Sequence, residues 1–157
     1  MDTRMNYAHA SPGAVHAMLQ LEGYVRECGL ERSLLELVRM RASQINRCGY
    51  CLDMHSKDAR AAGESEQRLY VLPAWREAPF YSERERAALA WTEAVSAISV
   101  EDVSDELYQA ARAQFSEKEL MDLTMAVIAI NGWNRLSVAF RKAPAVAIPS
   151  QTKGVAA

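Results

Sequence analysis

The sequence predicts an all-α protein folded as one domain. Apolar residues recur at helical spacing along most of its 157 residues, and no segment alternates apolar and polar side chains as a half-buried strand does. Half of the residues are hydrophobic and 24% are charged, a balance typical of a folded chain rather than a disordered one. We therefore expect one helical domain over residues 1–157, with a core at about 13–143 and an extended or frayed tail at 144–157.

Short sequence signals mark where the expected helices begin and end. Ser11 followed by Pro12 suits the start of a first helix, and Gly29 suits its end, so residues 1–11 should be irregular. Two capping boxes, each a serine followed three residues later by a glutamate, start later helices. The expected helices cover residues 13–28, 31–45, 50–63, 65–72, 83–98, 105–115 and 117–140. The centre of the last helix is apolar on all sides, which predicts burial within the domain or against another subunit.

Charge and hydropathy exclude several classes of partner. The net charge is −2 and basic residues are scattered, so neither nucleic acid nor an anionic membrane is an expected partner. The longest apolar run, from Met125 to Ile130, is far shorter than the ~20 residues needed to cross a bilayer. The first residues lack the apolar segment of a signal peptide, so we expect a cytoplasmic location, where thiols stay reduced unless they serve redox chemistry.

The stretch from Asn46 to His55 carries the chemistry. Cys48 and Cys51 stand three residues apart, and His55 follows four residues after Cys51. A disulfide between the two cysteines would close a very small ring and contribute only about 2 kcal/mol of stability. Such a bond is a weak structural staple but a suitable reversible redox couple, so the pattern favours dithiol–disulfide chemistry.

His55 and Glu36 are the expected proton-transfer groups. His55 lies one helical turn after Cys51, on the same face, where its imidazole can accept the thiol proton. Asn and Gly suit the break at residues 46–49, so the helices on either side should form an antiparallel hairpin that sets Glu36 and His55 at similar heights. The apolar neighbours of Glu36 predict a raised pKa, which suits a proton acceptor.

Several alternatives remain open on the residues alone. A helix N-terminus could acidify either cysteine, although the link to His55 favours Cys51. Cys48, Cys51 and His55 could instead hold zinc with Cys28 or Asp53, but no second CxxC or HxxxH pair supports this. Purely structural roles are also possible interpretations for two of these residues. Glu36 could simply pair with the arginine three residues on, and Cys28 could be an inert apolar side chain.

The segment from Glu36 to His55, with the spacing Glu-x11-Cys-x2-Cys-x3-His, resembles the core signature of the AhpD-like alkylhydroperoxidases. These proteins belong to the carboxymuconolactone decarboxylase superfamily. Residues 82–95 and 131–136 are similar to later helices of the same group, so the resemblance covers about residues 13–143. Tyr50 stands where the best-known members carry a second histidine.

The resemblance implies an all-helical fold that assembles as a homo-oligomer, a trimer or a hexamer. It also implies peroxidase activity on hydrogen or organic peroxides, with Glu36, Cys48, Cys51 and His55 as a proton relay and redox pair. In that scheme Cys51 attacks the peroxide and Cys48 resolves the product. No bound cofactor or metal is expected, and an external thiol or a lipoyl-bearing protein would supply electrons. A lactone decarboxylase and a non-enzymatic thiol redox sensor are the alternative functions.

Overall fold

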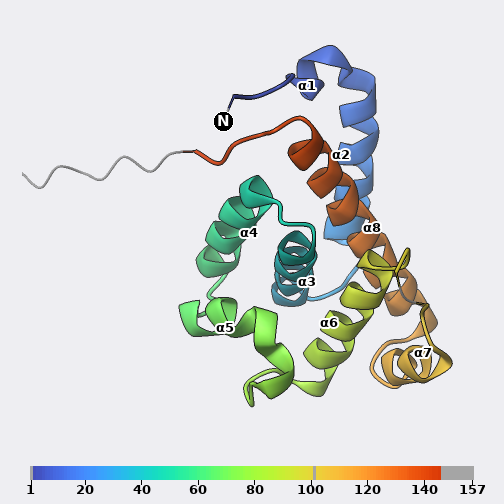
Figure 1. Ribbon diagram of the computed structural model, residues 1–157. Coiled ribbons are helices and arrows are strands. Elements are labelled where there is room, and N and C mark those ends of the chain that lie inside the picture. The colour runs from blue at the N-terminus through green and yellow to red at the C-terminus, as the bar shows by residue number, and fades with distance from the viewer. Residues whose placement is uncertain (1, 101, 146–157) are drawn as a thin grey trace, which may run out of the picture.

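The computed structural model describes residues 2–100 and 102–145, and that part of the chain is helical without strands (Figure 1). The prediction of an all-α fold is confirmed. The helices are α1 (Tyr7–Ala10), α2 (Pro12–Glu27), α3 (Arg32–Ile45), α4 (Gly49–Ala61), α5 (Glu66–Val71), the 3₁₀ helix η1 (Leu72–Glu77), α6 (Glu83–Ser96), α7 (Asp105–Arg112) and α8 (Glu117–Ala139).

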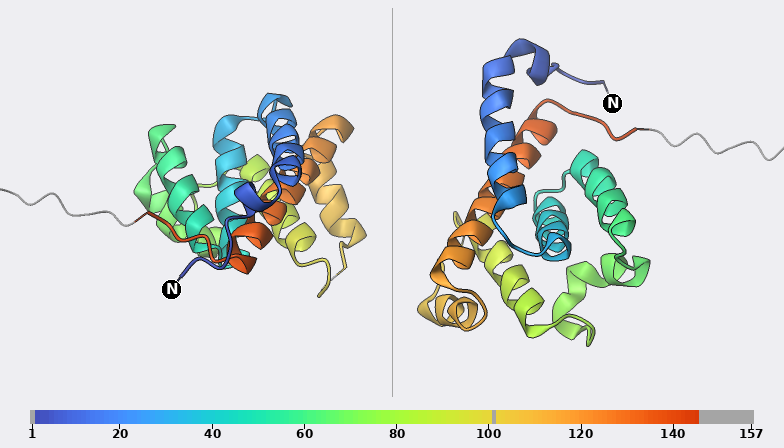
Figure 2. Two further views of the ribbon diagram at one scale, coloured as in Figure 1. Left: turned by 90° about the horizontal axis from the view of Figure 1, so that it is seen from above. Right: turned by 180° about the vertical axis from the view of Figure 1, so that it is seen from behind.

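Helix α3 lies at the centre, packed against α4, α6 and α8, while α2 packs along α8 (Figures 1 and 2). Its Leu35 and Val38 belong to an apolar cluster shared with α8. Leu37 and Met40 belong to a second cluster, formed with α5 and η1. A fully buried side chain such as Leu37 contributes roughly 2 kcal/mol by leaving water. The core therefore surrounds α3, which carries Glu36.

The expected elements and the observed ones differ at some ends. Residues 7–10 form the short helix α1 rather than an irregular segment, because the Asn6 side chain accepts the His9 N–H and caps the turn. Helix α4 begins at Gly49 and ends at Ala61, and Gly63 follows with a φ of 96°. The connection left between the expected helices 65–72 and 83–98 holds η1. The remaining helices keep their expected positions within a few residues, the usual uncertainty of helix ends.

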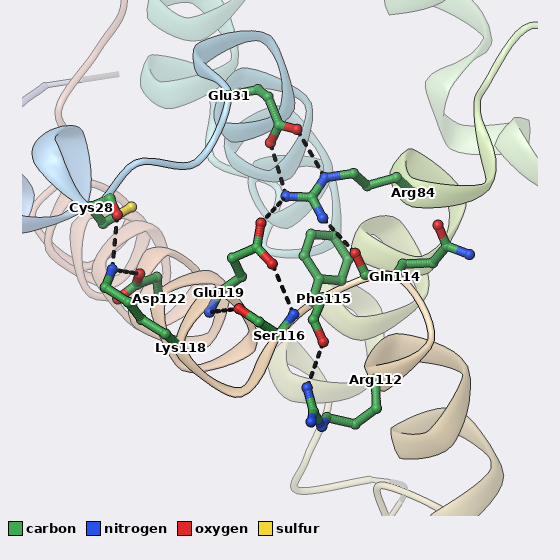
Figure 3. A network of polar contacts seen from close by, with 10 residues as sticks. All are labelled: Cys28, Glu31, Arg84, Arg112, Gln114, Phe115, Ser116, Lys118, Glu119 and Asp122. Atoms are coloured by element: carbon green, nitrogen blue, oxygen red, sulfur yellow. Dashed lines mark hydrogen bonds and ion pairs between the residues drawn. The ribbon is translucent and has the colours of Figure 1, made fainter.

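Both predicted capping boxes are present, at Ser82 and Ser116. Near the second, Arg84 joins three parts of the chain (Figure 3). Its guanidinium donates to Glu31 at 2.9 Å and to Glu119 at 2.7 Å, and stacks 4.2 Å from the centre of the Phe115 ring. This network fixes the starts of α6 and α8 relative to the loop before α3.

The surface of α8 is partly apolar within the single chain. Val127 and Ala129 are buried, but Met121 and Ile128 are 57% and 47% exposed. The predicted all-round apolar helix therefore buries only part of its surface within this chain. No helix of residues 2–100 and 102–145 combines the length and the apolar character needed to span a membrane. The predicted tail at 144–157 lies outside the described residues except for positions 144 and 145.

Asparagine side chains join the end of α3 to α8. The Asn46 amide donates to Asn131 Oδ1 at 2.9 Å and to Asn134 Oδ1 at 3.0 Å. Asn134 is fully buried and donates in turn to Ser43 Oγ at 3.1 Å. Buried amides of this kind are costly unless paired, so their pairing fixes the register between the two helices. The register positions the turn that carries Cys48.

Substitution Asn134→Ala should lower the free energy of unfolding by about 2 kcal/mol, because it removes two buried hydrogen bonds and leaves Asn46 and Ser43 partly unpaired. Urea denaturation measures the change. Glu117→Ala, at an exposed position of the same helix, is the control and should change stability little. Equal stabilities for Asn134→Ala and Glu117→Ala would contradict the structural role of this network.

Candidate active site

The turn between α3 and α4 is a Schellman motif that places Cys48 at a helix start. The Cys48 N–H donates to Ser43 O at 3.0 Å, and the Arg47 N–H donates to Gln44 O at 3.2 Å. Arg47 adopts the left-handed conformation, with a φ of 54°. Asn and Gly were expected to make this turn, but Asn46 has helical dihedrals and serves through its side chain, while Gly49 is the first residue of α4.

Cys48 and Cys51 are joined by a disulfide, with their Cα atoms 5.4 Å apart. Cys48 is the N-cap of α4, and its sulfur accepts the Cys51 N–H at 3.4 Å. Both cysteines are 1% exposed. The helix start and the donated N–H favour negative charge on the Cys48 sulfur, so its thiolate form is stabilised once the disulfide is reduced. Cys28 lies apart from them, half-buried against the core, as expected for an apolar side chain.

His55 and Glu36 lie in contact between α4 and α3, as the hairpin argument predicted. His55 Nδ1 lies 3.0 Å from Glu36 Oε2, and both side chains are buried. Glu36 Oε1 accepts from Arg39 at 2.7 Å, and Arg39 reaches Glu22 on α2 at 2.5 Å. A carboxylate acceptor assigns the proton to Nδ1 of a neutral His55, which leaves Nε2 able to accept another proton.

The prediction that the pKa of Glu36 is raised is wrong. Burial alone would raise it, but the hydrogen bond from His55 and the positive charge of Arg39 outweigh burial and hold the pKa of Glu36 below its ordinary value. Glu36 is therefore ionised at neutral pH. Its pairing with Arg39, considered from sequence as a structural alternative, exists together with the His55 contact. An ionised Glu36 orients His55, as the acid orients the histidine of a Ser-His-Asp triad.

Two neighbouring cavities border the disulfide, and Tyr50, Ser137 and Lys142 line both of them. One, of about 260 Å³, is lined by Cys51 and His55 together with Leu19, Met54 and Trp133. Its lining is mostly apolar, and Glu22 also borders it. The other, of about 560 Å³, is lined by Cys48 with Arg47 and residues that follow α8. The thiol beside the imidazole is thus Cys51, in a pocket with room for a small organic molecule.

Tyr50 stands between these cavities and lines both. The ammonium of Lys142 lies 4.0 Å from the centre of the Tyr50 ring, a cation–π distance. Burial opposes the charge of Lys142, but Tyr50 and Tyr7 hold its pKa above the ordinary value. Lys142 therefore carries a full charge beside the dithiol.

Sequence reasoning missed Glu22 and Lys142. No local signal identifies either residue, because α2 and the end of α8 reach the site only through tertiary packing. The zinc set considered from sequence is not assembled either. Among the described residues, the group of three potential ligands within 4.8 Å is Glu36, His55 and Asp58, and the cysteines do not belong to it.

An all-helical hairpin that holds a CxxC pair beside a histidine–glutamate pair defines a protein of the AhpD-like class. Residues 12–94 match the sequence model of the carboxymuconolactone decarboxylase family, and a Bacillus subtilis relative is 41% identical. The chain therefore belongs to the carboxymuconolactone decarboxylase family. That relative, the uncharacterized protein YdfG, is matched over 88% of this chain and 95% of its own length.

Solved structures share the fold. A protein of unknown function from Agrobacterium tumefaciens, suggested to be the antioxidant defence protein AhpD, superposes with a TM-score of 0.90 and is 45% identical over 93% of this chain and all of its own. The debrominase Bmp8 superposes with a TM-score of 0.78, covering 88% of this chain and 74% of its own. At 20% identity, Bmp8 shows the shared fold alone.

Substitution Glu36→Gln should lower the free energy of unfolding by roughly 3 kcal/mol at neutral pH, because it removes one partner of a buried ion pair. Glu36 has a lowered pKa, so its stabilisation is present above the ordinary value of 4.5 and is lost as the pH falls through the folded-state pKa. The difference between wild type and Glu36→Gln should therefore shrink in acid.

Urea denaturation over a range of pH measures both effects. The control is Glu117→Gln, since the side chain of Glu117 is 87% exposed, and its stability should match wild type throughout. A difference between wild type and Glu36→Gln that grows as the pH falls would contradict an ionised Glu36.

Proposed function

We propose that the protein is a thiol-dependent peroxidase of the alkylhydroperoxidase type, reducing hydrogen or organic peroxides. The observation that carries the proposal is the shared cavity of Cys51 and His55, with His55 held by the ionised Glu36. This arrangement joins a thiol, a general base and an orienting carboxylate. The mostly apolar walls suit the alkyl part of an organic peroxide.

The first step forms a sulfenic acid on Cys51. With the dithiol reduced, Cys51 gives its proton to Nε2 of His55, and the thiolate attacks one oxygen of the peroxide. The sulfur–oxygen bond forms as the oxygen–oxygen bond breaks, and the leaving oxygen takes the proton from His55 as an alcohol, or as water from hydrogen peroxide. Glu36 stabilises the charged imidazole during this transfer.

The second step closes the disulfide. The Cys48 thiolate, favoured by the start of α4, attacks the Cys51 sulfur and releases hydroxide, which leaves as water after taking a proton. One dithiol and one peroxide thus give one disulfide, one alcohol and one water. An external thiol must then return two electrons, and no bound cofactor takes part in this scheme.

Single substitutions test the proposed roles of Cys51 as the attacking sulfur and of His55 as the general base. Cys51→Ser should abolish peroxide consumption in the presence of dithiothreitol, since it removes the attacking sulfur. His55→Gln should slow the peroxide step by roughly a hundredfold or more, because it removes the general base. Steady-state peroxide loss measures both effects, and Cys28→Ser, on a thiol outside the site, is the control. Turnover by Cys51→Ser equal to that of Cys28→Ser would disprove the proposal.

We also propose a homo-oligomer, a trimer or a hexamer, formed through the exposed apolar side chains of α8. Met121 and Ile128 are too exposed for so apolar a helix in a lone chain, and burying them between copies would be favourable. Light scattering on purified protein should give a mass three or six times the chain mass of 17.5 kDa. Ile128→Glu should shift it downward, and a monomeric wild type would contradict the proposal.

A further inference from the structure

The cavity beside Cys48 is lined by four cationic side chains. Arg4, Arg47, Arg141 and Lys142 border its volume of about 560 Å³. Most other lysines and arginines of the described residues form ion pairs with carboxylates, but none of these four has a carboxylate partner within residues 2–100 and 102–145. Arg4 donates instead to the Ala139 carbonyl at 3.0 Å. Their charge is therefore available to a ligand.

Two of the four occupy a backbone conformation that favours glycine. Arg47 follows α3 and Arg141 follows α8, with φ of 54° and 55°. Arg141 repeats the Schellman pattern of Arg47, since the Lys142 N–H donates to Ser137 O at 2.9 Å and the Arg141 N–H to Val138 O at 3.3 Å. Each arginine costs about 1 kcal/mol more than glycine in this conformation.

Glycine holds the left-handed position elsewhere in the described chain. Gly29 follows α2 with a φ of 102°, and Gly63 follows α4 with a φ of 96°. Only the two helix ends that border the Cys48 cavity use arginine, and both arginines line that one cavity. A cation at a helix end interacts favourably with the helix dipole, but that effect applies equally to α2 and α4. The helix dipole alone therefore does not explain why arginine, rather than glycine, occupies the two helix ends that border this cavity.

Most of the positive charge lies outside the cavity assigned to the peroxide. Peroxides are neutral at physiological pH, and of the four cationic residues only Lys142 also borders the cavity of Cys51 and His55. The cationic cavity borders Cys48, which is 1% exposed. In the proposed cycle peroxide reacts at Cys51, so a molecule bound in this cavity is placed to react with Cys48 as the reductant.

We propose that the cavity lined by Arg4, Arg47, Arg141 and Lys142 binds the carboxylate of a small dithiol reductant and directs its thiolate to Cys48. This inference rests on the proposed redox function of the same cysteines. Peroxide and reductant then use two neighbouring cavities, one bordered by Cys51 and the other by Cys48.

Reduction by this route takes place by two successive thiol–disulfide exchanges. A reductant thiolate attacks the Cys48 sulfur, a new disulfide forms between them, and the Cys48–Cys51 bond breaks. Cys51 leaves as a thiolate beside His55, which can protonate it. The second thiol of the reductant then attacks the reductant sulfur that is bonded to Cys48. This step releases Cys48 as a thiolate at the start of α4 and leaves the reductant as a cyclic disulfide.

The test measures reduction of the disulfide alone, without peroxide. Oxidised full-length protein is mixed anaerobically with dihydrolipoate or with dihydrolipoamide, which carry the same dithiol and differ in one carboxylate charge. Samples are quenched with acid and alkylated, and mass spectrometry counts the free thiols. Dihydrolipoate should react roughly tenfold faster, and this advantage should fall as salt is added.

The double variant Arg47→Asn with Arg141→Asn should bring the ratio of the two rates close to one. Asparagine tolerates the left-handed conformation, so the change removes charge with little strain. Arg32→Asn is the matched control, since Arg32 is exposed on α3 and does not line the cavity, and it should keep the wild-type ratio.

Equal rates for the two reductants with wild type would overturn the proposal, as would a ratio unchanged in the double variant. Because the readout needs no peroxide, it separates this inference from the peroxidase proposal. A protein that is reduced with the expected charge preference but consumes no peroxide would refute the peroxidase and leave the reductant site standing.

Discussion

The buried contact of Glu36 with His55 and Arg39 is the interaction on which the site depends. A carboxylate at the centre of a helical core is costly unless its charge is matched, and here the imidazole and the guanidinium match it. The pairing holds the pKa of Glu36 low despite burial and fixes the orientation of the His55 ring. The rest of the fold surrounds α3 so that this carboxylate stays buried and in place.

The turn after α3 is the second constraint. Asn46 ties it to α8 through Asn131 and Asn134, and the left-handed Arg47 brings Cys48 to the start of α4. Cys51 consequently lies one turn before His55. Cys51 borders a mostly apolar cavity and Cys48 a neighbouring cavity with more cationic residues. In the proposed mechanism this asymmetry gives the two cysteines different roles.

The sequence predicted the contact of Glu36 with His55 because helix rise and a tight turn fix the heights of residues in a hairpin. It did not predict the ionisation of Glu36, since burial can be read from apolar neighbours but the balance against Arg39 and His55 requires distances. It missed Glu22 and Lys142 because long-range packing carries them to the site. The left-handed conformation of Arg47 was not predicted for a different reason: glycine is the residue that favours this conformation, and the chain has arginine there.

The central claim is that the Glu36–His55 pair makes Cys51 the sulfur that attacks peroxide. The most direct measurement uses Cys48→Ser, which cannot close the disulfide, treated with a stoichiometric amount of peroxide and then with dimedone, a reagent that traps sulfenic acid. Peptide mass spectrometry locates the trapped adduct. The account predicts the adduct on Cys51 and its loss when Cys51 is also replaced. An adduct on Cys28, or none at all, would contradict it.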